Sequence, residues 1–264
     1  MNTWEQFEKQ CTDYLNLKFG DYAKFLLLGG SNSTVVDILA KTNNGNAFYI
    51  EVKQSPSQCG QFVLIPNFKT KKFEYSHLNV SHNNKYSQLI IDYMNDNFDE
   101  FSDVDSTGKD IIMPNGSDIF ANWITHFYKE KDVKFFISNN FIIIPIDNFK
   151  YYFYIKAKYR VKRSGSSNVG RENLSNILEF IKSQNYCIKD YRFFNDKIFV
   201  YSTNNLHKKK FFYNNNEYMF SDRDGIYEVR KLSNTFNANV IFSIRLIDSV
   251  LGLSPYQFID YLMK

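Results

Sequence analysis

Cysteine is scarce in this sequence, and its placement argues against two kinds of stabilised fold. Only three of the 264 residues are cysteines, Cys11, Cys59 and Cys187. Their number is odd, their spacing is wide, and no Cys-x-x-Cys pair occurs. A disulfide framework and a structural zinc site are therefore not expected.

Long apolar stretches are also missing. No apolar run approaches the roughly 20 residues that a membrane-spanning helix needs. The opening residues, Met1-Asn2-Thr3-Trp4-Glu5, lack the basic and then apolar pattern of a secretion signal. We therefore expect a soluble protein of the reducing cytoplasm, with no membrane partner.

Net charge and aromatic content leave the class of partner open. The formal charge is only +4, which allows a nucleic-acid partner without requiring one, because local clustering of cations matters more than the total. Phe and Tyr are numerous, at 26 and 19 residues, but Asn and Lys are abundant too, as in proteins from AT-rich genomes. The aromatic content is therefore no evidence for base stacking. With 44% hydrophobic residues, the chain can form a packed core.

Helical and strand-like periodicities follow one another along the chain. They predict a first helix that includes residues 4–15, further helices over 55–65, 86–101, 118–131 and 172–183, and a closing helix from 255. They predict strands over residues 22–28, 35–40, 47–53, 133–138, 141–145 and 152–161, with short strands and Asn-rich turns after 183. The expected fold is α/β or α+β, a mixed central β-sheet flanked by helices. We treat residues 1–264 as one domain; the alternative is a C-terminal subdomain from about residue 172.

Three residues near a predicted hairpin have the chemistry of phosphodiester hydrolysis. The Asn44-Gly45 step predicts a turn between two strands, with Asp37 on the first strand and Glu51 and Lys53 near the end of the second. Side chains alternate along a strand, so Glu51 and Lys53 should share one face. Two carboxylates can hold Mg²⁺, which stabilises charge on the phosphate and acidifies an attacking water. A lysine can orient that water or stabilise the transition state.

The same spacing has a less specific interpretation, since an acid-x-lysine triplet also arises by chance. Glu51 and Lys53 could form an exposed ion pair on a solvated strand face. The chain even contains a second copy of the pattern, Asp118 followed by Asp132 and Lys134. That copy is rejected because a helix fills its gap and Asp132 begins a strand rather than ending one.

Two neighbouring features favour the catalytic interpretation. Glu8 lies on the apolar face of the first helix, where a carboxylate is costly unless it is paired or binds a metal. It is a candidate metal ligand; the alternative is a rim residue that reaches solvent. After Lys53 come three glutamines, Gln54, Gln58 and Gln61, and glutamine can contact base edges or phosphates. Ser55, Pro56 and Gln58 together fit the start of a helix there.

The triplet resembles that of the PD-(D/E)xK nuclease superfamily, with Val36-Asp37 where the family has Pro-Asp. Longer blocks resemble the HhaI-like type II restriction endonucleases. These blocks are residues 4–16, 48–51, 57–67, 159–166 and 232–243, and the resemblance is weakest over 173–224. It implies a PD-(D/E)xK restriction-endonuclease-like core that cleaves double-stranded DNA at GCGC with Mg²⁺. It also implies a partner in function, a DNA methyltransferase that acts on the same site.

A row of cations provides the candidate DNA-binding surface. Lys156, Lys158, Arg160 and Lys162 alternate with apolar residues, which places them on one face of a strand. The following polar loop adds Arg163, Ser164, Ser166 and Asn168. We expect the strand cations to contact phosphates and Arg163 to read guanine, with which arginine forms two hydrogen bonds. The alternative is an ordinary solvated strand face.

Two rival functions remain open at this point. One is a junction or repair nuclease built on the same core. The other is a DNA-binding protein whose nuclease core is inactive.

Overall fold

The computed structural model describes residues 3–29, 35–76 and 83–264. The chain divides into two compact units, one formed by Met1–Arg160 with Ala238–Lys264 and the other by Val161–Asn237. From sequence we treated the chain as one domain and placed an alternative boundary near 172. The second unit begins about ten residues earlier, and the chain afterwards returns to the first unit.

The first sheet of the larger unit carries the predicted hairpin. Its strands lie in the order β1, β2, β3, β7 and β8. Their bounds are Ala23–Leu27, Ile38–Thr42, Ala47–Val52, Val133–Ser138 and Ile142–Pro145. All pairs are antiparallel except β3 and β7, which run parallel. The predicted hairpin and the predicted strand at 133–138 are confirmed.

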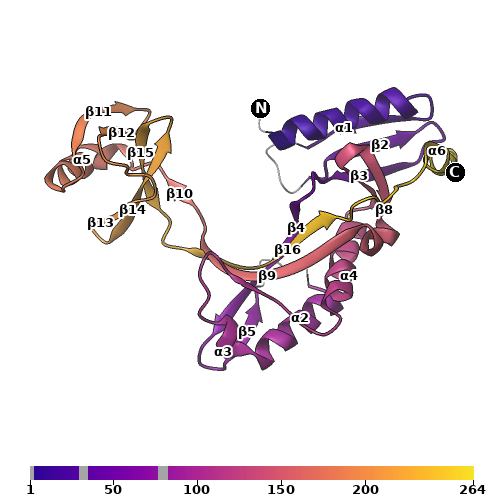
Figure 1. Ribbon diagram of the computed structural model, residues 1–264, viewed down its shortest axis with the longest axis horizontal. Helices are drawn as coiled ribbons and strands as arrows, with labels where there is room; N and C mark the ends of the chain where they lie inside the picture. Colours follow the sequence, from indigo (N-terminus) through magenta and orange to yellow (C-terminus); the bar gives the residue numbers. More distant parts are fainter. Residues whose placement is uncertain (1–2, 30–34, 77–82) are drawn as a thin grey trace. The chain divides into compact units, whose positions relative to one another are not determined.

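Helices cover both faces of this sheet. Helix α1 (Thr3–Phe19) lies along β2 and β3 in Figure 1, and the closing helix α6 (Pro255–Met263) packs on the same face. Ile50 and Val52 point into this core, as the alternation along β3 predicts. Helix α4 (Gly116–Lys129) covers the opposite face, where the Tyr128 and Phe136 rings meet edge to face.

The second sheet of the larger unit has the strand order β5, β4, β16, β9 and β6. Their bounds are Lys72–Tyr75, Ser57–Asn67, Phe236–Leu246, Phe153–Arg163 and Lys109–Asp110. Trp123 of α4 stacks on Phe242 of β16, with ring centroids 4.4 Å apart, so α4 contacts both sheets. The remaining elements of this unit are α2 (Lys85–Asp96), α3 (Phe98–Phe101), η2 (Asn139–Phe141) and η3 (Ile146–Tyr151).

The helix predicted over residues 55–65 is wrong, because Ser57–Asn67 forms strand β4. The cause is an irregularity in its pairing with β16, where the register shifts between Ile241 and Ser243. Gly60 adopts a φ of +94° there, a conformation that glycine adopts easily. Cys59 and Phe62 are therefore both buried although three residues apart. That spacing imitates the period of a helix.

The smaller unit is a sheet covered by one helix. Its strands β11, β12, β15, β14 and β13 lie in that order, and β10 pairs with β15. Their bounds are Ile188–Phe194, Lys197–Ser202, Ile226–Leu232, Asn216–Arg223, Lys210–Tyr213 and Ser166–Ser167. Helix α5 (Leu174–Ser183), preceded by η4 (Arg171–Asn173), buries Ile177 and Ile181 against this sheet.

Within the described residues, every helix is too short or too polar to cross a lipid bilayer.

Candidate active site

The structure brings Asp37, Glu51 and Lys53 together at one end of the β2–β3 hairpin. Glu51 belongs to β3, and Lys53 follows directly after its last residue. We had expected Asp37 inside the first strand of the hairpin, but it lies just before β2. Its carboxylate accepts a hydrogen bond of 2.8 Å from the backbone N–H of Val52. This bond fixes Asp37 beside the end of β3.

Glu51 is buried and shares one of its oxygens between two donors. Its side chain is 8% exposed, and its Oε1 lies 2.5 Å from Nζ of Lys53, whose side chain is 18% exposed. The same oxygen accepts a hydrogen bond of 3.0 Å from the Tyr128 hydroxyl. The interpretation of Glu51 and Lys53 as an exposed surface pair is therefore wrong.

Glu8 joins this cluster from α1. Its side chain is buried, and its carboxyl group lies beside that of Asp37 where both approach Gly29. Gly29 makes room for them, because a Cβ built there would lie 2.4 Å from Glu8 Oε2 and 3.3 Å from Asp37 Oδ1. Two buried carboxyl groups side by side disfavour each other's charged form, and a bound cation would offset this.

The electrostatics of the cluster show an excess of negative charge. Burial and the neighbouring Glu51 carboxylate raise the pKa of Asp37 to about 7. Burial also raises the pKa of Glu8, against the opposing effect of the Lys53 cation. Burial alone would lower the pKa of Lys53, but the Glu51 and Asp37 carboxylates raise it above its ordinary value. Lys53 is therefore a cation at neutral pH.

The donor set fits a hard divalent cation in its chemistry. Among the residues that the structure describes, no three His, Cys, Asp or Glu side chains already stand in a metal-binding arrangement. However, Asp37, Glu51 and Glu8 supply the carboxylate oxygens that Mg²⁺ prefers. Burial and the neighbouring Glu51 carboxylate raise the pKa of Asp37, and such a cation would favour its charged form.

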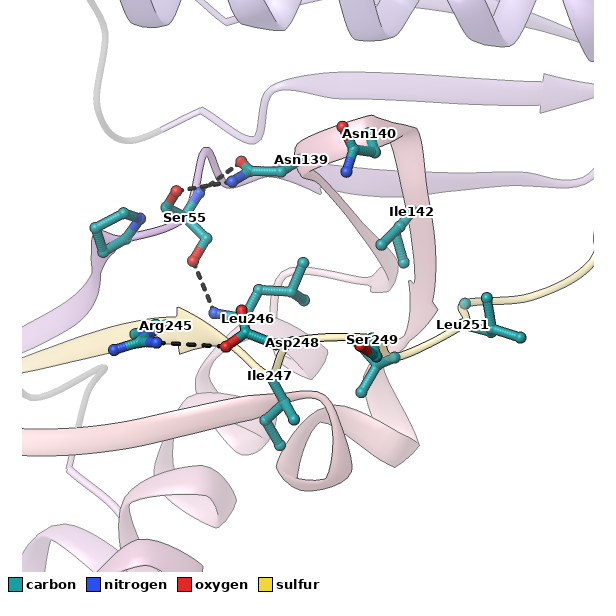
Figure 2. Close-up of a pocket in the computed structure, with 13 residues that line it drawn as sticks. Ser55, Asn139, Asn140, Ile142, Arg245, Leu246, Ile247, Asp248, Ser249 and Leu251 are labelled. Carbon is teal, nitrogen blue, oxygen red and sulfur yellow. Dashed lines mark hydrogen bonds and ion pairs between the residues drawn. The ribbon is translucent and has the colours of Figure 1, made fainter.

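Beyond Lys53, a clamp of hydrogen bonds holds the backbone. The Ser138 hydroxyl donates to the Lys53 carbonyl over 2.7 Å, and Lys53 N–H donates to Ile137. Asn139 accepts from the N–H of Ser55 and donates to its carbonyl, and Figure 2 shows the two residues facing each other. The Ser55 hydroxyl in turn accepts from the N–H of Leu246. The backbone on either side of Lys53 is thus held in place.

A pocket of about 800 Å³ opens beside this clamp. Its lining includes Ser55, Asn139 and the segment that follows β16, from Arg245 to Gly252. Arg245 points along this segment and pairs with Asp248 over 3.5 Å. Ser55, which lines the pocket, is two residues beyond Lys53 in the sequence. The pocket therefore borders the segment that carries Lys53.

Sequence reasoning missed Tyr128, Ser138 and Asn139 and the close approach at Gly29. Tyr128 lies within the helix predicted over 118–131, and its ring packs in the core like an ordinary aromatic residue of that helix. The second acid-x-lysine pattern, which we rejected from the sequence, lies on the surface. Lys134 and Asp132 pair over 2.9 Å with side chains 45% and 54% exposed.

Two of the three candidate glutamines lie together on the second sheet. Gln58 and Gln61 are exposed on β4, and the Gln58 amide donates to Gln61 over 3.0 Å. Arg160 of β9 approaches Gln58 at 3.5 Å, while its buried Nε has no hydrogen-bond partner among the described residues. Gln54 is exposed between β3 and β4, not on a helix. Gln58, Gln61 and Arg160 form a polar group with unused donors.

The predicted alternation of cations along β9 is confirmed. Ile155, Ala157 and Tyr159 are buried, whereas Lys156 is exposed and Lys158 and Arg160 are half-buried. Lys158 contacts Asp110 at 3.5 Å. Lys162, further along the strand and within the second unit, is exposed.

Arg163, the last residue of β9, and the polar segment after it are held by contacts that the sequence does not reveal. Arg163 forms an ion pair with the buried Glu217 and donates to the Ser233 carbonyl over 2.6 Å. Ser164 bonds to the Ser233 hydroxyl over 2.8 Å. Arg230, anchored on buried Glu228, donates to Ser166 and Asn168. The Arg163 guanidinium is therefore already engaged inside the second unit.

Comparisons with known proteins yield one informative match. No protein-family model matches the sequence, and no curated protein sequence matches it. A solved structure described as HhaI endonuclease in complex with DNA at pH 6.0 is 41% identical to this chain. The match has a TM-score of 0.74 and covers 95% of this chain and 93% of that one.

Proposed function

Because the chain belongs to the HhaI-like type II restriction endonucleases, we propose that it hydrolyses phosphodiester bonds of double-stranded DNA at a short palindrome. GCGC is the first candidate for that palindrome. The observation that carries the proposal is the buried cluster of Asp37, Glu51 and Lys53 at the end of the hairpin. The solved relative was crystallised with DNA, which supports a DNA substrate.

We include Mg²⁺ and a PD-(D/E)xK core in the proposal. Asp37 and Glu51, with Glu8 beside them, would hold the ion through carboxylate oxygens. Bound Mg²⁺ would supply charge that stabilises the phosphate and acidifies the attacking water. Lys53, protonated at neutral pH, would orient that water or stabilise the developing negative charge. Asp37, held by Val52 N–H, would keep its carboxylate in place throughout.

The biological setting follows from this activity. An enzyme that cuts a short palindrome would also cut the DNA of its own cell. We therefore propose a methyltransferase that modifies the same sequence in the cytoplasm, as a partner in function rather than in a complex.

A plasmid digest tests the proposal directly. Linear plasmid is incubated with the protein and Mg²⁺, and the fragment ends are sequenced. Cleavage at one defined palindrome, abolished by EDTA, is the expected result. Cleavage at branched or damaged sites only would indicate a junction or repair nuclease. Binding without any nicking in Mg²⁺ would indicate an inactive core.

We propose that DNA is positioned and read by different side chains of one sheet face. Lys156 and Lys158 would contact phosphates, which position the duplex without reading it. Gln58, Gln61 and Arg160 lie on the same face of the sheet and have unused hydrogen-bonding groups. Arg163 stays a candidate reader, but it would have to leave Glu217 to meet a base. We therefore propose Arg160, before Arg163, as the arginine that reads bases.

Alternating neighbours on β9 provide a matched pair for testing this division. Arg160→Ala is expected to lose about 1–3 kcal/mol of discrimination against single-base changes. Lys158→Ala should weaken cognate and random DNA alike and reduce the salt slope by about one unit. Competition binding with cognate and altered duplexes measures both. If Arg163→Ala lost discrimination between cognate and altered duplexes and Arg160→Ala did not, Arg163 would be the residue that reads bases.

Glu8 provides a test of the metal ligand set. Glu8→Gln keeps the shape of the side chain but removes its charge. The Mg²⁺ concentration for half-maximal cleavage is expected to rise by about tenfold or more. Asp13→Asn, an exposed acid on the same helix, is the control and should leave that concentration unchanged. An unaltered metal titration in Glu8→Gln would assign Glu8 a purely structural role.

A further inference from the structure

Tyr128 is a buried titratable residue that the mechanism above does not use. Its side chain is almost fully buried near the end of α4, with its ring edge to face with those of Phe127 and Phe136. Ring centroids lie 4.9 Å and 5.0 Å apart in these contacts. The packing holds the ring and so determines where its hydroxyl group lies.

The hydroxyl is a donor aimed at the catalytic cluster. It lies 3.0 Å from Oε1 of Glu51, and a carboxylate oxygen can only accept. Burial raises the pKa of Tyr128 well above its ordinary value, with the Cys59 and Glu51 side chains adding to the effect. In this geometry the hydroxyl is the donor and Glu51 is the acceptor.

Two donors restrict the rotation of the Glu51 carboxylate more than one donor does. Lys53 lies two residues further along the chain and ends in a flexible ammonium group. Tyr128 belongs to a different element and has only a short rigid ring. With both donors on Oε1, the rotation of the carboxylate is defined and its second oxygen is left for another ligand. Hydrogen bonds to ligating carboxylates commonly tune metal sites in this way.

We propose that Tyr128 is a positioning residue for DNA cleavage, whose hydroxyl holds the Glu51 carboxylate in its working orientation. The inference rests on the proposed function of Glu51 in the reaction. Helix α4, whose other buried residues pack in the core, would thereby also support the candidate active site. Tyr128 is buried and its hydroxyl bonds to Glu51, so its effect on the reaction would pass through Glu51.

Tyr128→Phe tests the proposal, because it removes the hydroxyl and keeps the ring. We expect kcat to fall about 10–100-fold and the half-saturating Mg²⁺ concentration to rise, since outer partners of metal ligands have effects of this size. KM for DNA should not change. Tyr159→Phe is the matched control. Tyr159 is buried like Tyr128, and its hydroxyl donates to the Leu64 carbonyl over 2.9 Å, away from the cluster.

A second measurement does not depend on cleavage. Mn²⁺ binding to the DNA-free protein is measured by calorimetry for the wild type and both tyrosine variants, well below their unfolding midpoints. Weaker Mn²⁺ binding in Tyr128→Phe than in Tyr159→Phe is expected. Each variant loses one buried hydroxyl hydrogen bond, so a general loss of stability affects both alike. Equal Mn²⁺ affinity and equal kcat in the two variants would overturn the proposal.

Different results would contradict the proposed function of Glu51 and the positioning role of Tyr128. If wild-type protein cleaves and Glu51→Gln does not, the proposed function stands, and only the Tyr128 comparison decides the positioning role. If wild-type protein and Glu51→Gln bind Mn²⁺ equally and neither cleaves DNA, Glu51 is not the metal ligand. The positioning role then falls together with the proposed function.

Discussion

Asp37→Asn protein is expected to cleave DNA on the order of 10³-fold more slowly than wild type while still binding it. Loss of a metal ligand removes several kcal/mol of transition-state stabilisation, and each 1.36 kcal/mol is tenfold in rate. Asparagine keeps a carbonyl oxygen that can accept from Val52 N–H, so the end of β3 should remain intact. Single-turnover cleavage in Mg²⁺ and duplex binding in Ca²⁺ separate the two effects.

The second acid pattern supplies the control for this experiment. Asp118 is 60% exposed and pairs with Lys150 on the surface. Asp118→Asn removes the same charge from the same residue type and should cleave normally. Near-normal turnover by purified Asp37→Asn would end the claim that this cluster is the cutting centre.

Lys53→Ala should also lower kcat strongly, but without loss of metal binding. Removing one preorganised donor to a developing negative charge costs about 10²–10³ in kcat. The carboxylates remain, and Glu51 keeps its bond to Tyr128, so metal binding should persist. Rapid-quench measurement of kcat, together with a Mn²⁺ titration, checks both statements.

Lys134→Ala is the counterpart of Lys53→Ala in the surface pattern. Lys134 pairs with Asp132 at the exposed start of β7, and this pair contributes little to stability. Its loss should change neither kcat nor metal affinity. If Lys53→Ala lost metal affinity to the same extent as Asp37→Asn, Lys53 would be maintaining the site rather than stabilising the transition state.

The parts of the site that the sequence predicted correctly depend on local rules. The Asn44-Gly45 turn and the two-residue alternation of β3 placed Glu51 and Lys53 on one face, away from the core around Ile50. Strand β7 was predicted with its observed bounds because a compact apolar run marks it. Such patterns are contained within a few residues, so they can be read without the fold.

The errors arise where local rules compete with long-range contacts. The sequence of strand β4 predicted a helix because its apolar residues are three apart around Gly60. That spacing comes from a register shift in its pairing with β16, which lies almost 180 residues away in the sequence. Tyr128 could not be connected to Glu51, which is 77 positions earlier, until α4 was packed against the sheet. Arg163 looked free for the same reason, since its partner Glu217 is 54 positions away.

The place of α6 in the core affects the order in which the enzyme matures during synthesis. Phe258 and Leu262 are buried with Phe19 of α1 and Phe135 of β7, under the sheet that carries the hairpin. Ribosomes make this helix after every other described element, so a growing chain holds the hairpin while its core is still open. Folding generally proceeds from the N-terminus as synthesis advances. We therefore expect the hairpin that carries Glu51 to lack part of its supporting core until α6 has been synthesised and has packed against it.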